Sequence, residues 1–206
     1  MKNASMLAAC LAVSSALAAT SGCVDTDDHY AFDPSSPGLA SGCYGEPPQD
    51  RLEGRVYSVP IETRHIPDLS ALPLEGTICM DHLYLPERRD FPGLGGRKEW
   101  FAIEFRGTFD VSAPGVFQFR LTADDGARLY IDGAPVIDDD GFHVPLSKEG
   151  TVQLAAGRHT ILVPYWQGPG PLALILEVAR PGEPYQIFHT DRPLIGIVPQ
   201  PTETPQ

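Results

Sequence analysis

The sequence predicts an all-β protein, an antiparallel β-sandwich flanked by a disordered N-terminal tether and a disordered C-terminal tail. Short apolar runs with period-two alternation recur along the middle of the chain, as expected for strands that bury one face. Turn residues separate these runs, and the chain contains 20 Gly and 21 Pro. No stretch keeps a helical apolar stripe beyond about two turns, so a helical bundle is excluded.

The alternation assigns an inward face to each predicted strand, and turn signals such as Asp125-Gly126 and Asp132-Gly133 separate the strands. The predicted inward residues are Phe101, Ile103, Phe105 and Phe109 in the run 99–109; Phe117, Phe119, Leu121 and Ala123 in 116–123; Leu129 and Ile131 in 127–132; Ile161, Val163 and Tyr165 in 159–165; and Leu172, Leu174, Leu176 and Val178 in 172–178.

The first residues are typical of a secretory signal peptide. Lys2 gives a positive start, and residues 6–19 form an apolar core that is shorter than the ~20 residues of a membrane-crossing helix. Thr-Ser-Gly-Cys at 20–23 resembles a bacterial lipoprotein processing site, which implies lipidation of Cys23 and an outer-membrane or cell-surface location. The alternative is cleavage after Ala18 or Ala19, which would make the protein periplasmic or secreted.

The predicted organisation is a signal peptide at 1–22, a lipid-anchored flexible tether at 23–50, a folded domain at 51–182 and a Pro-rich tail at 183–206. Export would place Cys43 and Cys79 in an oxidising compartment, and we predict a structural disulfide between them. In the chain-entropy model such a loop closure stabilises the fold by about 3.8 kcal/mol. A zinc site is the poorer alternative because the two cysteines are 36 residues apart and do not have the ligand spacing of a zinc motif.

Charge and motifs narrow the function classes. The formal net charge of −12 disfavours nucleic acid and anionic lipid as partners, and it suits cations or neutral ligands held through a cation. No His-Glu-x-x-His, Gly-x-Ser-x-Gly or phosphate-loop motif occurs. No carboxylate lies in an apolar sequence setting that would prepare it for acid catalysis. We therefore predict a protein that is not an enzyme.

One long segment is more specific than a generic β pattern. Residues 117–133 read FQFRLTADDGARLYIDG, and Val-Ile-Asp at 136–138, Gly-Phe-His at 141–143 and VQLAAGRH at 152–159 follow. This segment resembles the protective-antigen (PA-fourteen) domain, a β-sandwich found in toxins, glycosidases, yeast flocculins and bacterial envelope proteins. Gly-Arg-Val-Tyr at 54–57, Ile-Pro-Asp-Leu at 66–69 and Trp-Phe-Ala-Ile at 100–103 match its entry strands, so the resemblance covers residues 51–182.

The resemblance implies a calcium-dependent sugar site. In the sugar-binding adhesins of the family, two consecutive aspartates joined by a cis peptide hold a calcium ion that also ligates sugar hydroxyls. Asp124 and Asp125 match that pair, and carboxylate oxygens are ligands that calcium prefers. A second family loop, here residues 166–171, normally supplies an asparagine. The only asparagine of this chain is Asn3, in the leader, and Gln167 is the nearest substitute as a metal and ligand contact.

Alternatives stay open at this site. Asp124-Asp125-Gly126 also fits a hairpin turn whose aspartates bond to nearby backbone N–H groups. Alternation turns Tyr165 into the core and Trp166 away from it, so Trp166 is the candidate ligand platform at the mouth of the loop. Asp138-Asp139-Asp140-Gly141 lacks the anchoring carboxylates of a helix-loop-helix calcium site and is interpreted as a solvated acidic turn.

Two functional hypotheses follow. The first is an envelope-anchored module that binds carbohydrate through Ca²⁺ at Asp124 and Asp125, with Trp166 and Gln167 as further ligand contacts. The second is a metal-free structural or protein-interaction lipoprotein of the envelope. The expected partners are a carbohydrate or another envelope component, together with a membrane reached through the lipid anchor.

Overall fold

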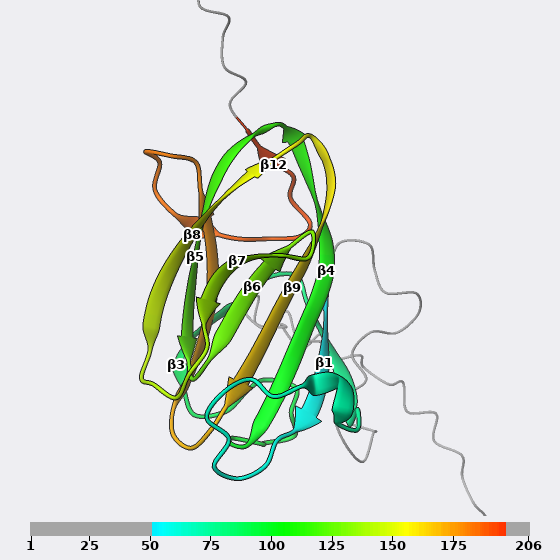
Figure 1. The fold of residues 1–206 in the computed structure, drawn as a ribbon, viewed down its shortest axis with the longest axis vertical. Coiled ribbons are helices and arrows are strands. Elements are labelled where there is room, and N and C mark those ends of the chain that lie inside the picture. Colours follow the sequence, from blue (N-terminus) through cyan, green and yellow to red (C-terminus); the bar gives the residue numbers. More distant parts are fainter. Residues whose placement is uncertain (1–50, 197–206) are drawn as a thin grey trace, which may run out of the picture.

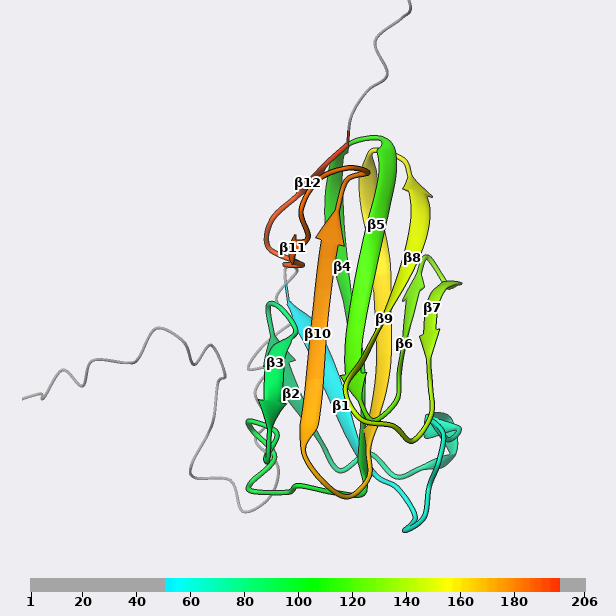
Figure 2. The same ribbon diagram turned by 90° about the vertical axis from the view of Figure 1, so that its left-hand side faces the viewer.

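The computed structural model describes residues 51–196, which form two β-sheets and one short 3-10 turn (Figure 1). The sheets lie face to face when the molecule is seen from the side (Figure 2). The predicted antiparallel β-sandwich is thereby confirmed. The signal peptide, the tether, Cys23 and Cys43 lie outside the described residues, so lipidation, anchoring and the disulfide stay predictions.

The first sheet has seven strands in the order β2-β1-β4-β9-β6-β7, with β12 beside β4. In this order the strands are β2 (Gly76–Met80), β1 (Leu52–Ser58), β4 (Phe101–Ala113), β9 (Gly157–Gln167), β6 (Ala127–Ile131), β7 (Ala134–Asp139) and β12 (Leu194–Ile195). The long pair β4 and β9 forms its centre, with Phe101 opposite Gln167 at one end and Val111 opposite Gly157 at the other. All pairings in this sheet are antiparallel except that of β12 with β4.

The second sheet has five strands in the order β11-β10-β5-β8, with β3 also pairing with β10. The strands are β11 (Gln186–Ile187), β10 (Leu172–Ala179), β5 (Gly115–Asp124), β8 (Leu146–Leu154) and β3 (Tyr84–Arg88). A 3-10 turn, η1 (Leu69–Ala71), lies in the connection from β1 to β2.

The core between the sheets contains all the residues that alternation turned inward, together with buried residues of other segments such as Phe91. Every predicted inward residue of the runs 99–109, 116–123, 127–132, 159–165 and 172–178 is buried. Phe101, Phe105 and Tyr165 gather around Phe91, with ring centroids 5.9 to 6.2 Å from it. A large apolar side chain contributes about 1.5–3 kcal/mol when it is fully buried, so this core is the main stabilising term.

Gly54 of β1 leaves room on the inner face of the first sheet for the side chains of the two neighbouring strands. It pairs with Ile78 of β2 on one side and with Phe105 of β4 on the other. A Cβ atom on Gly54 would lie 2.7 Å from Phe105 Cε1, 2.8 Å from Ile78 Cγ1 and 2.9 Å from Ile103 Cγ2. The neighbouring side chains therefore fill the space that a side chain at this position would need.

A second apolar cluster lies on the opposite face of the first sheet, where the β1–β2 connection covers it. Tyr57, Val59, Leu69, Ala102 and Trp166 are its buried members. Val59 N donates to Trp100 O at 3.0 Å, which ties the start of the connection to the edge of β4. The connection thus acts as a third, partial layer over one end of the sandwich.

The C-terminal boundary needs correction, because the predicted tail at 183–206 begins too early. Phe188 is fully buried and packs edge-on against Phe109, with ring centroids 5.2 Å apart. The strands β11 and β12 fall within residues 183–196 and pair with β10 and β4. Pro-rich composition suggested a tail, but the apolar residues between the prolines complete the core.

Within residues 51–196 no helix has the length and apolar character to cross a membrane.

Cys79 of β2, one of the two cysteines of the predicted disulfide, is buried, at 3% exposure.

Gly54→Ala should lower the free energy of unfolding by about 1–3 kcal/mol, because the new methyl group meets side chains that are already packed. Urea denaturation of purified protein measures this. Leu74→Ala is the control, since Leu74 is 53% exposed and should change stability by less than about 0.5 kcal/mol. Equal stability of Gly54→Ala and the parent would contradict the packing described for β1.

Candidate functional site

Several loops meet at one end of the sandwich, the lower end in Figure 1. We call this region the acidic end; it comprises residues 124–126, 139–143 and 166–171. The β5–β6 turn and the end of β9 are joined by Trp166 N, which donates to Gly126 O at 2.9 Å. The β1–β2 connection reaches the same region, where Ile66 N donates to Asp140 Oδ1 at 2.8 Å. Segments far apart in sequence therefore share one small surface.

Asp124 and Asp125, the Asp pair, lie at the centre of this end. Asp124 is the last residue of β5 and pairs with Ala173 of β10, and a cis peptide bond joins it to Asp125. The two residues are 7% and 2% exposed. Asp125 Oδ2 accepts a hydrogen bond from Gly168 N at 2.7 Å, so the Asp pair is connected to the β9–β10 loop. In a local hairpin turn these carboxylates would bond to their neighbours in the chain, whereas this bond spans 43 residues.

The Asp pair is electrostatically costly to ionise. Burial and the neighbouring Asp125 carboxylate raise the pKa of Asp124 to about 6. Burial also raises the pKa of Asp125, although the backbone N–H groups of Gly168 and His143 partly offset this effect. Because a cation beside the two carboxylates would relieve both desolvation and mutual repulsion, the pair has the electrostatics of a cation-binding site.

Gly126 completes the turn because no side chain fits there. A Cβ at this position would lie 2.6 Å from Trp166 Nε1, 2.7 Å from Gly141 N and 2.8 Å from Asp140 Oδ1. The β5–β6 turn is therefore packed against both β9 and the β7–β8 loop. This packing fixes where the Asp pair lies relative to the other loops.

Gln167 is fully buried, and the Tyr165 hydroxyl lies between it and Asp124. Its Nε2 donates to Pro171 O at 2.9 Å, and its Oε1 lies 2.6 Å from the Tyr165 hydroxyl. That hydroxyl is also 2.7 Å from Asp124 O, and its single proton serves one of the two oxygens at a time. The expectation that Gln167 offers a ligand oxygen needs correction for this conformation, because its amide is already engaged in supporting the loop.

The predicted ligand platform at Trp166 also needs correction. As alternation predicted, Trp166 points away from the core that holds Tyr165, but it is 0% exposed. Its ring lies in the outer apolar cluster with Tyr57 and Leu69, under the β1–β2 connection. A ring covered in this way has no face free for a ligand.

Phe142 is the exposed aromatic residue of the acidic end. It is 48% exposed, and its ring centroid lies 6.4 Å from that of Trp166 at an interplanar angle of 31°. The Arg64 guanidinium lies 4.5 Å from the Phe142 centroid, a cation–π distance that holds the ring in place. Sequence reasoning included Phe142 in the Gly-Phe-His motif and gave it no role, because nothing local indicates that it lies beside Gly168 and the Asp pair.

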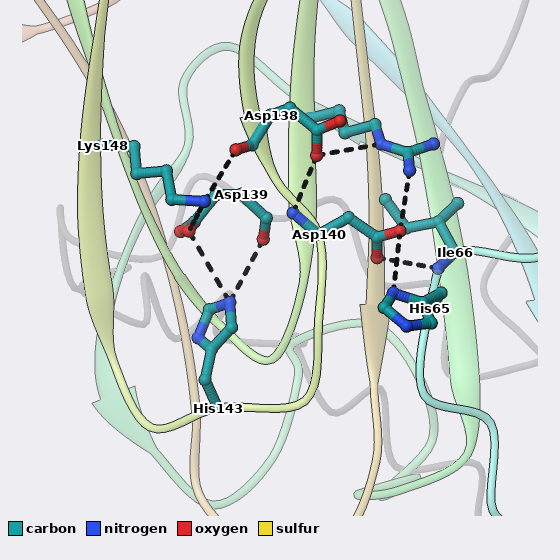
Figure 3. A network of polar contacts seen from close by, with 8 residues as sticks. His65, Ile66, Asp138, Asp139, Asp140, His143 and Lys148 are labelled. Carbon is teal, nitrogen blue, oxygen red and sulfur yellow. Dashed lines mark hydrogen bonds and ion pairs between the residues drawn. The ribbon is translucent and has the colours of Figure 1, made fainter.

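Asp139, at the end of β7, is a buried carboxylate that the sequence interpretation missed. It is 0% exposed, and burial raises its pKa although Lys148 and His143 lower it in part. Figure 3 shows Lys148 and His143 converging on it; Lys148 Nζ lies 3.3 Å and His143 Nε2 3.6 Å from Oδ1. Neither carboxylate oxygen has an aligned hydrogen bond from the described residues.

His143 lies near both Asp139 and the Asp pair, whose carboxylates act on its pKa. Its Nδ1 lies 2.9 Å from Val144 O and its Nε2 3.2 Å from Asp139 O. An imidazole that donates from both nitrogens is the charged form. Burial by itself lowers the pKa of His143, but the two carbonyls and the carboxylates of Asp139 and Asp125 raise it overall.

Asp140 joins the β7–β8 loop to the rest of the acidic end. Its side chain is 4% exposed and accepts from Arg128 Nη2 at 2.8 Å and, as Figure 3 shows, from Ile66 N. The interpretation of 138–141 as a solvated acidic turn is therefore wrong for Asp139 and Asp140. The period-two pattern of β7 contains a signal for Asp139, because Ile137 is buried and Asp139 shares its face.

The sequence model of the PA14 domain matches residues 89–191. The chain belongs to the PA14 domain family. No curated protein matches the sequence. Among solved structures, this PA14 domain is similar to that of the antifreeze protein MpAFP, with a TM-score of 0.60 and 18% identity over 75% of this chain and 97% of that one.

Two further structures resemble this PA14 domain. One is the PA14 sugar-binding domain of an RTX adhesin, with a TM-score of 0.58 and 18% identity over 72% of this chain and 100% of that one. The other is the A domain of Epithelial Adhesin 9 from Candida glabrata in complex with Galb1-3GlcNAc, with a TM-score of 0.50 and 12% identity over 73% and 95%. At these identities the likeness shows the fold that the resemblance predicted.

Lys148→Ala should destabilise the protein at pH 8, because Asp139 would lose its nearest cation. Since Lys148 is 46% exposed, we expect a loss of about 1 kcal/mol rather than the 3–5 kcal/mol of a fully buried pair. The pKa of Asp139 in the folded protein is already raised and would rise further in the variant. The loss of stability is therefore complete at a pH above this higher pKa, where Asp139 is ionised, and fades as the pH falls and the carboxylate is protonated.

Urea denaturation at pH 8 and pH 4.5 measures this difference, with the exposed Lys98→Ala as the control for removal of one lysine charge. A loss in Lys148→Ala that is the same at both pH values would show that Lys148 acts through its hydrogen bond to Asp138 O alone.

Proposed function

We propose that this PA14 domain is the binding module of an exported, envelope-anchored protein and recognises carbohydrate through a calcium ion held by Asp124 and Asp125. The observation that carries the proposal is the Asp pair itself, two adjacent buried carboxylates at a loop-lined end of the sandwich. Among residues 51–196, no arginine or lysine forms an ion pair with either carboxylate of the Asp pair. The neighbouring aspartates 138–140, in contrast, each form an ion pair with Arg128 or Lys148.

The donor chemistry supports calcium. Calcium takes 6–8 oxygen ligands, and the Asp pair offers carboxylate oxygens from adjacent residues in a rigid turn. The ion would supply a hard, positively charged centre with coordination positions left over for neutral hydroxyl oxygens. Asp124 and Asp125 would hold it, while Gly168, Gln167 and Tyr165 keep the surrounding loops in position.

The surroundings of the Asp pair support a sugar as the ligand. Phe142 is about half exposed next to the pair, and the part of its ring that Arg64 leaves uncovered can pack against the apolar face of a sugar ring. The RTX adhesin domain is described as sugar-binding, and the Epithelial Adhesin 9 structure contains a bound disaccharide. We infer a binding role on these grounds and do not assign catalysis to the acidic end.

Export and anchoring are part of the proposal. The leader at 1–22 and Cys23 support a lipid anchor, and a Cys43–Cys79 disulfide would fit an oxidising compartment. A negative net charge of −12 is compatible with a neutral ligand held through a cation.

Asp124→Asn/Asp125→Asn should weaken calcium binding about 100-fold or more at pH 7.5, since both charged ligands are lost while the shape of the turn is kept. Calorimetry with calcium alone measures this on the purified protein. Asp90→Asn/Asp110→Asn is the matched control: it removes the same charge from side chains that are 54% and 49% exposed, and it should bind calcium as the parent does. Absence of calcium binding to the parent would overturn the proposal and favour a metal-free structural or protein-interaction role.

Phe142→Ala should lower sugar affinity about tenfold and leave calcium affinity unchanged, because the ring contacts the ligand and not the ion. A glycan array with calcium identifies the sugar, and titration of that sugar gives the affinities. Val144→Ala, which removes an apolar side chain that is 77% exposed in the same loop, is the control. Sugar binding that persists in the presence of a chelator would contradict the role of calcium, and absence of any bound sugar would contradict carbohydrate recognition.

A further inference from the structure

A second cluster of metal-ligating side chains lies away from the acidic end, beside the edge of β10 that pairs with β3 and β11. Asp81 and His82 fall between β2 and β3, and His189 follows β11. The cluster lies beside Leu176 of β10. Leu176 is four residues beyond Leu172, where β10 leaves the acidic end, so the cluster is about 13 Å along the strand from the acidic end. It is distinct from the Asp pair in position and in chemistry.

The backbone brings these residues together. Leu176 N donates to Leu83 O at 3.0 Å, and Phe188 N donates to Leu176 O at 2.9 Å, so the β3 and β11 segments meet beside one residue of β10. His82, which precedes Leu83, and His189, which follows Phe188, form an isolated antiparallel bridge.

A further pair of hydrogen bonds holds the two segments at this point. Thr190 donates from both its N and its Oγ1 to Asp81 O, each at 3.1 Å. The positions of Asp81, His82 and His189 are therefore set by the backbone and do not depend on flexible side chains alone.

The side chains of the three residues point toward one another. Each can contribute one ligand atom, and these atoms all lie within 4.8 Å of each other. The two imidazole centroids are 4.6 Å apart, and His82 Nδ1 lies 2.7 Å from Asp81 Oδ1. The three side chains are about one-fifth exposed, so an ion could enter from solvent and still be largely enclosed.

His189 provides an independent indication of a missing partner. Its Nδ1 is buried and has no hydrogen-bond partner among the described residues. The nearest carboxylate oxygen, Asp191 Oδ1, is 3.7 Å away, beyond hydrogen-bond distance. A buried ring nitrogen of this kind is normally satisfied by a donor, an acceptor or a metal ion.

We propose that Asp81, His82 and His189 bind a zinc ion that clips the β11 segment to the β2–β3 connection. Two imidazoles and one carboxylate form a ligand set that suits zinc and leaves a fourth position for water. Tetrahedral ligands at zinc distances are about 3.3 Å apart, so the three atoms need only small side-chain rotations to close around the ion. Calcium is a poor fit because it prefers oxygen ligands, which separates this site from the Asp pair.

The test uses the full chain, treated with a chelator and then dialysed. Zinc alone should bind with one-to-one stoichiometry in calorimetry and raise the melting temperature by about 5 °C, since it binds only the folded protein. His82→Gln and His189→Gln should each weaken zinc binding at least about 30-fold and abolish the thermal shift. His65→Gln is the control, because the His65 side chain is 73% exposed and lies at the acidic end.

A second measurement does not depend on the folding of the variants. Zinc should protect His82 and His189 of the parent protein from diethylpyrocarbonate and leave His65 reactive, as read by peptide mass spectrometry. Zinc that neither stabilises the parent nor protects these two histidines would overturn the proposal. Zinc binding that persists at parental affinity in both folded histidine variants would also overturn it, because the ligands would then lie elsewhere.

Discussion

The residues at the end of β9 hold the acidic end together. Tyr165 fills the core with its ring and places its hydroxyl under Asp124 O, while Trp166 N binds Gly126 O and Gly168 N binds the Asp125 carboxylate. Each such bond contributes about 1 kcal/mol net, but leaving any of these buried groups unpaired would cost more. The central strand of the first sheet therefore fixes the β5–β6 turn, which connects the two sheets.

This arrangement allows the domain to keep carboxylates in a dry environment. Asp124, Asp125 and Asp139 are nearly inaccessible to water, and burial is the largest cause of the raised pKa of each. Lys148 and His143 compensate Asp139, whereas the Asp pair has mainly backbone N–H groups. Asp139, whose charge is compensated by neighbouring side chains, therefore has a structural role. The carboxylates of the Asp pair, which have less compensation, are suited to an exchangeable cation.

Most of the fold could be predicted from the sequence because period-two alternation is a local property of each strand. It located the inward residues of β4, β5, β6, β9 and β10, and the motif at 117–133 indicated both the family and the Asp pair. Alternation also gave the direction of Trp166 correctly. It did not show that another segment covers the Trp166 ring, because Leu69, which packs in the same cluster, is nearly a hundred residues away in the sequence.

The sequence by itself determined the sandwich, its family and the residues of the Asp pair, since these depend on local patterns along single strands. Only the tertiary structure decided that Trp166 is covered, that Phe142 is exposed beside the Asp pair, and that Phe188 completes the core. The same holds for Asp81, His82 and His189, which become neighbours only when β3 and β11 meet beside Leu176. Burial and proximity depend on which segments pack together, and the spacing of residues along the chain does not carry that information.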